Sequence, residues 1–256
     1  MTRGMNPEDL YRIQWLAAAR ISSDGGTVAF TVTQMDRDTD DYRSAIWTMP
    51  VSGGEPKRFT SGTSKDSAPR WSPDGERLAF LSDRDGGKAQ VYLIDASGGE
   101  ARRLTDLKQG VSAPSWSPDG KQLIVFVQDD PERDSGDDGT SQKKPKTRPG
   151  RVITTLKYRA NGEGFTYDRR RHLFIVDAES GETRQLTEGD WDDIQPAWSP
   201  DSRRIAFVSA RHADRDYDRA EDIFVVEVGG GEAVQVTPGG GSCSLPAWSP
   251  DGRTIA

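Results

Sequence analysis

The sequence has 256 residues, of which 33% are hydrophobic and 29% charged, with 27 Gly and 15 Pro. This composition excludes long buried helices and is typical of many short elements joined by turns. The formal net charge of −7 excludes the basic surface that nucleic-acid-binding proteins carry, so we expect no nucleic-acid partner.

A five-residue motif recurs along the chain. It reads Trp-Ser-Pro-Asp-Gly at residues 71–75, 116–120 and 248–252, with Ser in place of Gly at 198–202 and a degenerate copy at 21–25. The starts are separated by 50, 45, 82 and 50 residues, so the third interval holds one repeat and about 37 inserted residues. Such recurrence indicates a repeat architecture.

A second motif runs in step with the first. It consists of an apolar run, a turn containing Gly-Glu, and an apolar residue followed by Thr, as in residues 46–60. The same pattern returns at residues 91–105, 173–187 and 223–237.

Each repeat predicts four strands. The first ends at the Trp, and Ser-Pro-Asp-Gly makes the turn, because Pro presets φ, Asp bonds locally and Gly accepts a left-handed backbone. In the second repeat, the later strands are expected at 78–81, 91–94 and 101–105. Four antiparallel strands in each repeat of about 40 to 50 residues are typical of a propeller blade. The predicted fold class is therefore all-β, a β-propeller.

The repeats divide the whole chain, residues 1–256, into blades. The expected bounds are about 20–60, 67–105, 112–187 with an insertion at 129–165, 194–237, and an incomplete fifth blade at 244–256. Because a strand that stops inside a blade leaves an unpaired edge, we expect this sequence to be a truncated piece of a longer protein. We also expect the isolated chain to be marginally stable or to associate with itself through that edge.

Three segments of the sequence resemble the acylaminoacyl-peptidase branch of the prolyl oligopeptidase family of serine peptidases. Residues 6–10, followed by 21–25, resemble the short lead helix and first blade of that family. Residues 157–165, ahead of 172–177, resemble its third-blade insertion, and residues 186–224 follow its fourth blade. The resemblance covers essentially the whole chain, although the blade repeat alone is shared with TolB-type propellers.

The resemblance implies a propeller that gates a C-terminal α/β-hydrolase domain, which acts on short or N-acylated peptides with a Ser-Asp-His triad. This chain has no Gly-x-Ser-x-Gly nucleophile motif, and its only histidines are His172 and His212. We therefore expect no catalytic residue here and assign the chemistry to a hydrolase domain absent from this sequence. The alternative is a non-enzymatic TolB-like propeller that acts as a protein-binding module.

The insertion contains the candidate site residues, Tyr158 and Arg159. Residues 129–150 are almost entirely polar and predict a solvated or disordered loop. The family-like stretch directly after it supports a sharper hypothesis, in which Tyr158 and Arg159 approach the peptide channel and meet a carboxylate or backbone group of the substrate.

Other conspicuous residues favour structural roles. The recurring Trp residues predict packing between blades, and the turn Asp residues predict turn formation. The Asp-rich loops at 36–41 and 214–222 lack the spacing of a calcium loop, and neither histidine has a Cys or second His nearby, so no metal or cofactor is expected. Cys243 predicts a small buried side chain.

The predicted location is the cytoplasm. A single cysteine excludes an internal disulfide, which favours a reducing compartment. Residues 1–20 show no apolar run like that of a signal peptide, and no segment approaches the roughly 20 apolar residues of a membrane span, so no membrane partner is expected.

Overall fold

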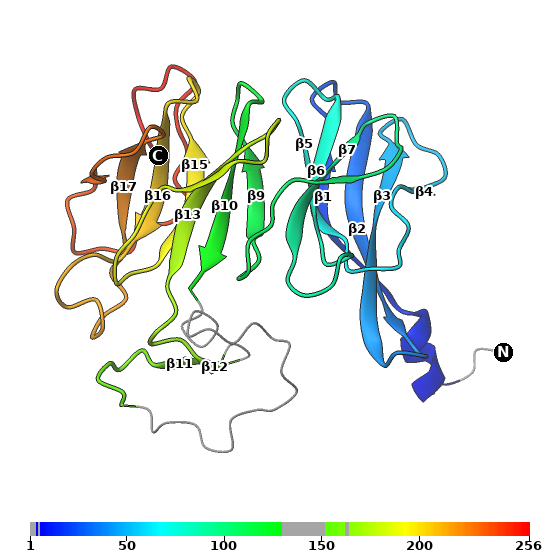
Figure 1. Ribbon diagram of the computed structural model, residues 1–256, viewed down its shortest axis with the longest axis horizontal. Helices are drawn as coiled ribbons and strands as arrows, with labels where there is room; N and C mark the ends of the chain where they lie inside the picture. Colours follow the sequence, from blue (N-terminus) through cyan, green and yellow to red (C-terminus); the bar gives the residue numbers. More distant parts are fainter. Residues whose placement is uncertain (1–3, 5, 130–151, 162–163) are drawn as a thin grey trace. The chain divides into compact units, whose positions relative to one another are not determined.

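The structure is a computed structural model that describes residue 4 and residues 6–129, 152–161 and 164–256. These residues are nearly all β (Figure 1), with one short 3-10 helix, η1 (Pro7–Arg12), which begins after Asn6. The chain forms two compact units, residues 1–125 with 176–183 and residues 126–175 with 184–256. No helix in the described part of the chain is long and apolar enough to cross a membrane.

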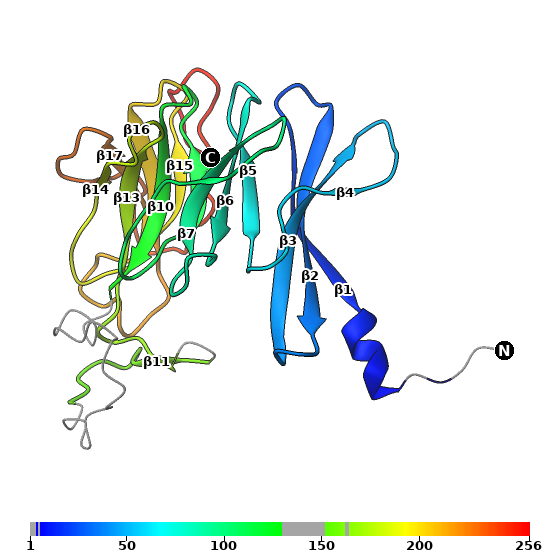
Figure 2. The ribbon, with the colours of Figure 1, turned by 45° about the vertical axis from the view of Figure 1, so that its right-hand side comes forward.

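The first two four-stranded sheets belong to the first unit, and each follows the order of the chain. Their strands are β1 (Gln14–Ile21), β2 (Thr27–Asp36), β3 (Asp41–Pro50) and β4 (Lys57–Arg58), then β5 (Ser67–Trp71), β6 (Arg77–Ser82), β7 (Gln90–Asp95) and β8 (Arg102–Arg103). Figure 2 shows η1 leading into the start of β1. The strands predicted at 78–81 and 91–94 lie within β6 and β7, whereas the one predicted at 101–105 pairs as a regular strand only over two residues.

The third and fourth sheets have the orders β14-β13-β10-β9 and β15-β16-β17-β18. Their strands are β9 (Ser112–Trp116), β10 (Gln122–Gln128), β13 (Arg171–Asp177) and β14 (Thr183–Gln185), then β15 (Asp193–Trp198), β16 (Arg204–Ser209), β17 (Asp222–Glu227) and β18 (Val234–Gln235). Between β10 and β13, β11 (Arg159–Ala160) pairs with β12 (Gly164–Phe165). The predicted disordered loop, 129–150, lies outside the described residues except for Asp129.

The Ser-Pro-Asp-Gly turns have one bonding scheme. The Ser72 hydroxyl donates to Asp74 Oδ1 at 2.5 Å and accepts from the Arg77 amide at 2.9 Å, while Gly75 has a φ of +75°. The same two serine contacts recur in the turns at 22–27, 117–122, 199–204 and 249–254. Because the serine hydroxyl and the next amides favour its charged form, the pKa of Asp74 lies below its ordinary value. The predicted role of these Asp residues as turn formers agrees with this bonding.

The repeated Trp residues join neighbouring sheets. At three of the repeats, the indole Nε1–H donates to a carbonyl oxygen in the first strand of the preceding sheet: Trp71 to Arg20 at 3.2 Å, Trp116 to Arg70 at 3.0 Å and Trp248 to Ala197 at 3.0 Å. From the preceding sheet, the Arg77 guanidinium lies 5.2 Å from the Trp116 ring centre and donates to the Gly120 carbonyl oxygen at 3.4 Å. The prediction of packing between blades fits this seam.

The Thr of the second motif satisfies a buried amide. In each sheet, its Oγ1 accepts the N–H of an apolar residue in the third strand along the chain: Ile46 to Thr60, Val91 to Thr105, Leu173 to Thr187, and Ile223 to Thr237, at 3.0 to 3.1 Å. The fourth strand is therefore attached to the third by a side chain as well as by its short ladder, which explains why Thr recurs at this position.

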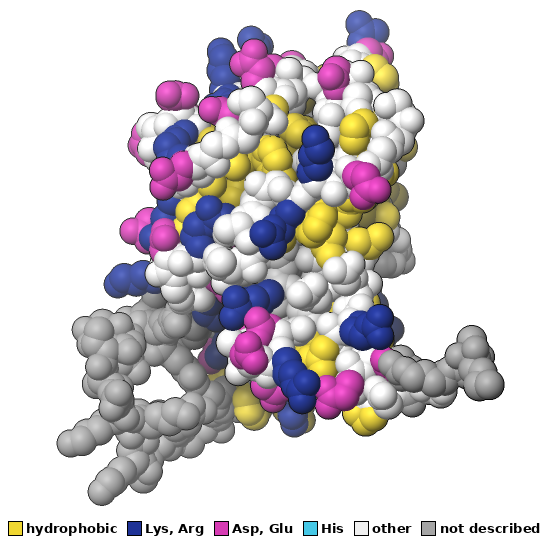
Figure 3. All heavy atoms as spheres, turned by 90° about the vertical axis from the view of Figure 1, so that its right-hand side faces the viewer, with side chains coloured by type: hydrophobic (Ala, Val, Ile, Leu, Met, Phe, Trp, Pro, Cys, Tyr) yellow, Lys and Arg dark blue, Asp and Glu magenta, His cyan; other side chains and the backbone are white. Residues whose placement is uncertain are grey.

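A hydrophobic core lies between the first two sheets. Phe80 and Tyr92 are cross-strand partners that stack at 5.9 Å and pack with Ile46 of the first sheet. In the first sheet, Phe30 and Trp47 hold the same cross-strand positions, but their face is open. It forms a groove of about 680 Å³, and Figure 3 shows hydrophobic side chains gathered on this side of the molecule.

Candidate functional site

The predicted site residues lie in the insertion hairpin, defined here as residues 156–161 and 164–165, which include β11 and β12. Tyr158 is 41% exposed, and its ring lies 6.3 Å from that of Phe165. Arg159 pairs with Phe165 across the two strands and is exposed. Two neighbouring exposed side chains, one aromatic and one cationic, are thus presented by a short ladder, an arrangement suited to contacting a carboxylate or a peptide backbone.

A loop of the fourth sheet contacts the insertion hairpin. This anchor loop, residues 210–221, connects β16 to β17. Asp216 Oδ2 accepts the amide of Leu156 at 2.7 Å, and Oδ1 accepts the amide of Lys157 at 2.9 Å. The Lys157 ammonium donates to the Arg215 carbonyl oxygen. The two amides favour the charged carboxylate, so the pKa of Asp216 lies below its ordinary value.

The anchor loop is itself tied to the framework by an ion-pair bridge. Asp190 Oδ2 lies 3.0 Å from Arg215 Nη2, and Asp190 Oδ1 lies 2.9 Å from Arg170 Nε, in the residue before β13. These groups and the start of the hairpin border a polar cavity of about 320 Å³, which is also lined by Trp191 and Glu221.

A buried charged cluster lies nearby in the same unit. Arg211 Nη2 donates to Asp193 Oδ1 at 2.8 Å, and the buried His172 ring lies 3.6 Å from Asp193 Oδ2 and 3.5 Å from Asp129 Oδ2. Burial raises the pKa of the Asp193 carboxyl, but His172 and Arg211 favour its charged form more strongly, so the pKa lies below its ordinary value.

The second sheet repeats this pairing without a histidine. Arg84 Nη2 lies 3.1 and 3.2 Å from the two carboxylate oxygens of the buried Asp66. In both sheets the arginine follows the second strand and the aspartate starts the first strand or directly precedes it. The recurrence indicates a scaffold contact that closes this end of a blade rather than a reaction centre.

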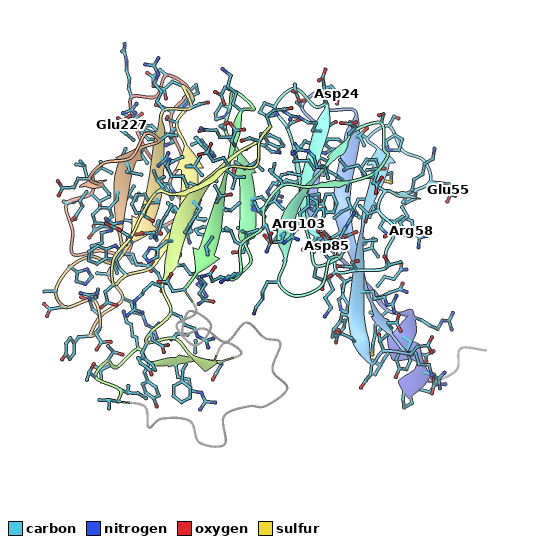
Figure 4. All side chains as sticks on the ribbon, viewed as in Figure 1. Asp24, Glu55, Arg58, Asp85, Arg103 and Glu227 are labelled. Atoms are coloured by element: carbon cyan, nitrogen blue, oxygen red, sulfur yellow. The ribbon has the colours of Figure 1, made fainter. Side chains whose placement is uncertain are left out.

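A third polar cluster involves β7 and β8 of the second sheet. The Tyr92 hydroxyl donates to Asp85 at 2.5 Å, and Arg103 Nη1 lies 3.6 Å from the same carboxylate (Figure 4). Burial, followed by the bond to Asp85, raises the pKa of Tyr92 to about 12, so its hydroxyl stays protonated and donates. This cluster links the 83–89 turn to β7 and β8.

The described residues contain no group of three or more His, Cys, Asp or Glu side chains that could hold a metal ion. Of the two histidines, His172 occupies the buried cluster and His212 lies 2.9 Å from Asp218. Cys243 is a partly exposed free thiol rather than a fully buried side chain. In the acidic loop at 214–222, the Asp216 and Asp218 carboxylates accept backbone amides. No signal in the sequence marks Asp216, because its partners are amides 59 and 60 residues away.

Four-stranded sheets that follow one another along the chain, with a repeated Trp that bonds to the preceding sheet at Trp71, Trp116 and Trp248, are typical of a β-propeller. The sequence matches the family described as PD40, TolB beta propeller domain, over residues 14–160. The chain therefore belongs to the TolB beta propeller domain family.

Relatives and solved structures confirm the predicted fold and family resemblance. The chain is 36% identical over 207 residues to the uncharacterized peptidase YuxL of Bacillus subtilis. It is 31% identical over 219 residues to dipeptidyl-peptidase 5 of Porphyromonas gingivalis. Each alignment covers 81% of this chain and 31% of the relative, so the chain spans about a third of the length of these peptidases.

Two solved structures share the fold. Acylaminoacyl peptidase of Pyrococcus horikoshii matches with a TM-score of 0.67 at 17% identity, over 90% of this chain and 33% of that one. TolB of Acinetobacter baumannii matches with a TM-score of 0.55 at 19% identity, over 94% of this chain and 48% of that one. The chain is thus a propeller homologous to a portion of peptidases, and the homology does not extend over the rest of their length.

Proposed function

We propose that this propeller is the substrate-gating portion of a serine peptidase that hydrolyses short or N-acylated peptides. The observation that carries the proposal is the 36% identity to a peptidase over 81% of this chain. The sequence contains no Gly-x-Ser-x-Gly, and both histidines lie beside carboxylates within propeller sheets or their loops. The nucleophile, its base and the acyl transfer therefore belong to an α/β-hydrolase domain in the full-length protein.

In this proposal, the insertion hairpin supplies the peptide contact. Arg159 is exposed on the short ladder, and its guanidinium offers the planar set of donors that matches a carboxylate or a peptide carbonyl. Tyr158 adds an exposed aromatic face beside it. Both side chains would bind and orient the peptide, while the hydrolase domain carries out the reaction.

The test is to measure kcat and KM for short free and N-acylated peptides in the full-length protein with Arg159→Ala. We expect KM to rise by about 10-fold, the cost of one charged hydrogen bond, with kcat nearly unchanged. Arg219→Ala, an exposed arginine of the anchor loop, is the matched control and should leave both constants unchanged. Unchanged constants in the Arg159 variant would refute the contact. A full-length protein without peptidase activity would favour the TolB-like binding module instead.

We also propose that the isolated chain associates with itself. The open groove beside Phe30 and Trp47 supports this, because the equivalent face of the second sheet is buried against the first sheet. In the other unit, Ile223, Val225 and Trp248 line a second open groove of about 470 Å³. The cytoplasmic location stays a prediction, which fractionation of expressing cells would test.

A further inference from the structure

We infer that Asp216 is a positioning residue, which holds the insertion hairpin where Tyr158 and Arg159 can meet the peptide. This inference rests on the proposed function, because it concerns the same peptide contact. Asp216 itself touches no substrate in this scheme and acts through the backbone of the hairpin.

The Asp216 carboxylate binds two adjacent residues at the start of the hairpin. Its two oxygens accept two successive amides, Leu156 at 2.7 Å and Lys157 at 2.9 Å. One planar group that bonds adjacent N–H donors fixes both the position and the direction of the backbone, and a charged acceptor strengthens each bond. Tyr158 directly follows Lys157, so the Asp216 carboxylate holds the backbone immediately before the two side chains, Tyr158 and Arg159, that it would position.

The anchor loop that carries Asp216 is itself bonded to the framework of the third sheet. Asp190 bridges Arg215, the residue before Asp216, to Arg170, which immediately precedes β13. Lys157 adds a bond from its ammonium to the Arg215 carbonyl oxygen. The hairpin is therefore connected through the anchor loop to the residue that precedes β13 of the third sheet. Arg211, near the start of the anchor loop, adds a second attachment through its bond to the buried Asp193 at 2.8 Å.

The contacts inside the hairpin define its own conformation but do not fix its position relative to the four-stranded sheets. The Thr166 amide donates to the Tyr158 carbonyl oxygen at 2.9 Å, and the Phe165 ring lies between those of Tyr158 and Tyr167, at 6.3 and 6.4 Å. These contacts join residues within ten positions of one another. A hairpin of only two paired residues on each side is marginal by itself, so its location depends on contacts to other segments.

The experiment combines a structural and a kinetic measurement on Asp216→Ala and Asp216→Asn in the full-length protein. The Asn side chain keeps the size and one acceptor oxygen, so it should act between Asp and Ala. Asp214→Asn is the matched control, because this acidic residue lies on the same loop and is exposed. The structural measurement is amide hydrogen exchange at Leu156 and Lys157, and the kinetic one is KM and kcat for short peptides.

We expect exchange at both amides to rise by about 10-fold or more in Asp216→Ala, with a smaller rise in Asp216→Asn and none in the control. KM should rise with kcat unchanged. Combining Asp216→Ala with Arg159→Ala should raise KM by less than the product of the two single effects, because both changes remove the same contact.

Three results would overturn the inference, and they differ in what they say of the proposed function. Unchanged exchange in Asp216→Ala would show that the carboxylate does not hold the hairpin. Faster exchange with a KM affected only by Arg159→Ala would remove the positioning role and leave the peptide contact intact. Faster exchange with KM unaffected by either change would refute the peptide contact itself, and the positioning role with it.

Discussion

The Thr105 contact offers a sharp test of the fold. Thr105 is 2% exposed, and its hydroxyl accepts the Val91 amide at 3.0 Å and donates to Gln90 Oε1 at 2.8 Å. In Thr105→Val, the amide of Val91, a fully buried residue, loses this acceptor. Gln90 Oε1 keeps the Leu107 amide as a donor at 3.1 Å, so only one buried group is left unsatisfied.

The expected cost follows from that count. A buried amide without a partner costs about 1 to 3 kcal/mol, so we expect the free energy of unfolding to fall by about 2 kcal/mol. Thr105→Ser keeps the hydroxyl and loses one methyl group, which costs about 0.8 kcal/mol. Thr237→Val removes the same bond at a half-buried position, where water can replace it, and should cost less than Thr105→Val.

The assay is equilibrium urea unfolding of the chain, with the midpoint and slope fitted together. A lower midpoint at constant slope in the order Thr105→Val, Thr105→Ser, wild type is the expected result. If Thr105→Val were as stable as the wild type, or if Thr105→Ser cost as much as Thr105→Val, the hydroxyl would not be the stabilising group and the reasoning would fail.

Two further predictions concern the turns and the open groove. Folding lowers the pKa of Asp74 from 3.8, so the stabilisation by its carboxylate is complete above pH 3.8 and is lost as the pH falls through the lowered pKa. In Asp74→Asn, the free energy of unfolding should therefore fall less steeply as the pH is lowered through the acid range. An acid dependence equal to that of the wild type would contradict this. Leu16 is 70% exposed and lines the groove of the first sheet, so Leu16→Glu should reduce self-association as measured by sedimentation velocity. Leu245, also exposed, lines neither this groove nor the one beside Trp248, so Leu245→Glu should leave self-association unchanged. Equal effects of the two changes would argue against association through the groove of the first sheet.

The repeats made the fold predictable, because each one carries its own local instructions. The Trp-Ser-Pro-Asp-Gly turns could be derived from φ preferences and short side-chain bonds, all within six residues. The predicted strand at 101–105 pairs regularly only at Arg102 and Arg103, since the Leu104 and Thr105 amides both turn toward the Val91 carbonyl oxygen. Local propensity does not contain that irregularity.

The candidate site was predictable only in part. The family-like stretch marked Tyr158 and Arg159, but nothing local marked Asp216, whose role depends on where two distant loops meet. The Asp193–Arg211 pair left a weak trace, because Ser-x-Arg occurs both at 82–84 and at 209–211. That trace became interpretable only when the structure placed a buried carboxylate beside each arginine.

The hydrogen bonds of the repeated Trp residues, called seams here, each join two consecutive repeats. The indoles of Trp71, Trp116 and Trp248 each bond to a carbonyl oxygen of the preceding sheet, so the energy of each of these seams belongs to two consecutive repeats. In such a series, a whole repeat can be duplicated or deleted without redesigning any seam, since the new neighbours present the same carbonyl and the same indole. Gene duplication could thus change the number of blades without inventing a new interface.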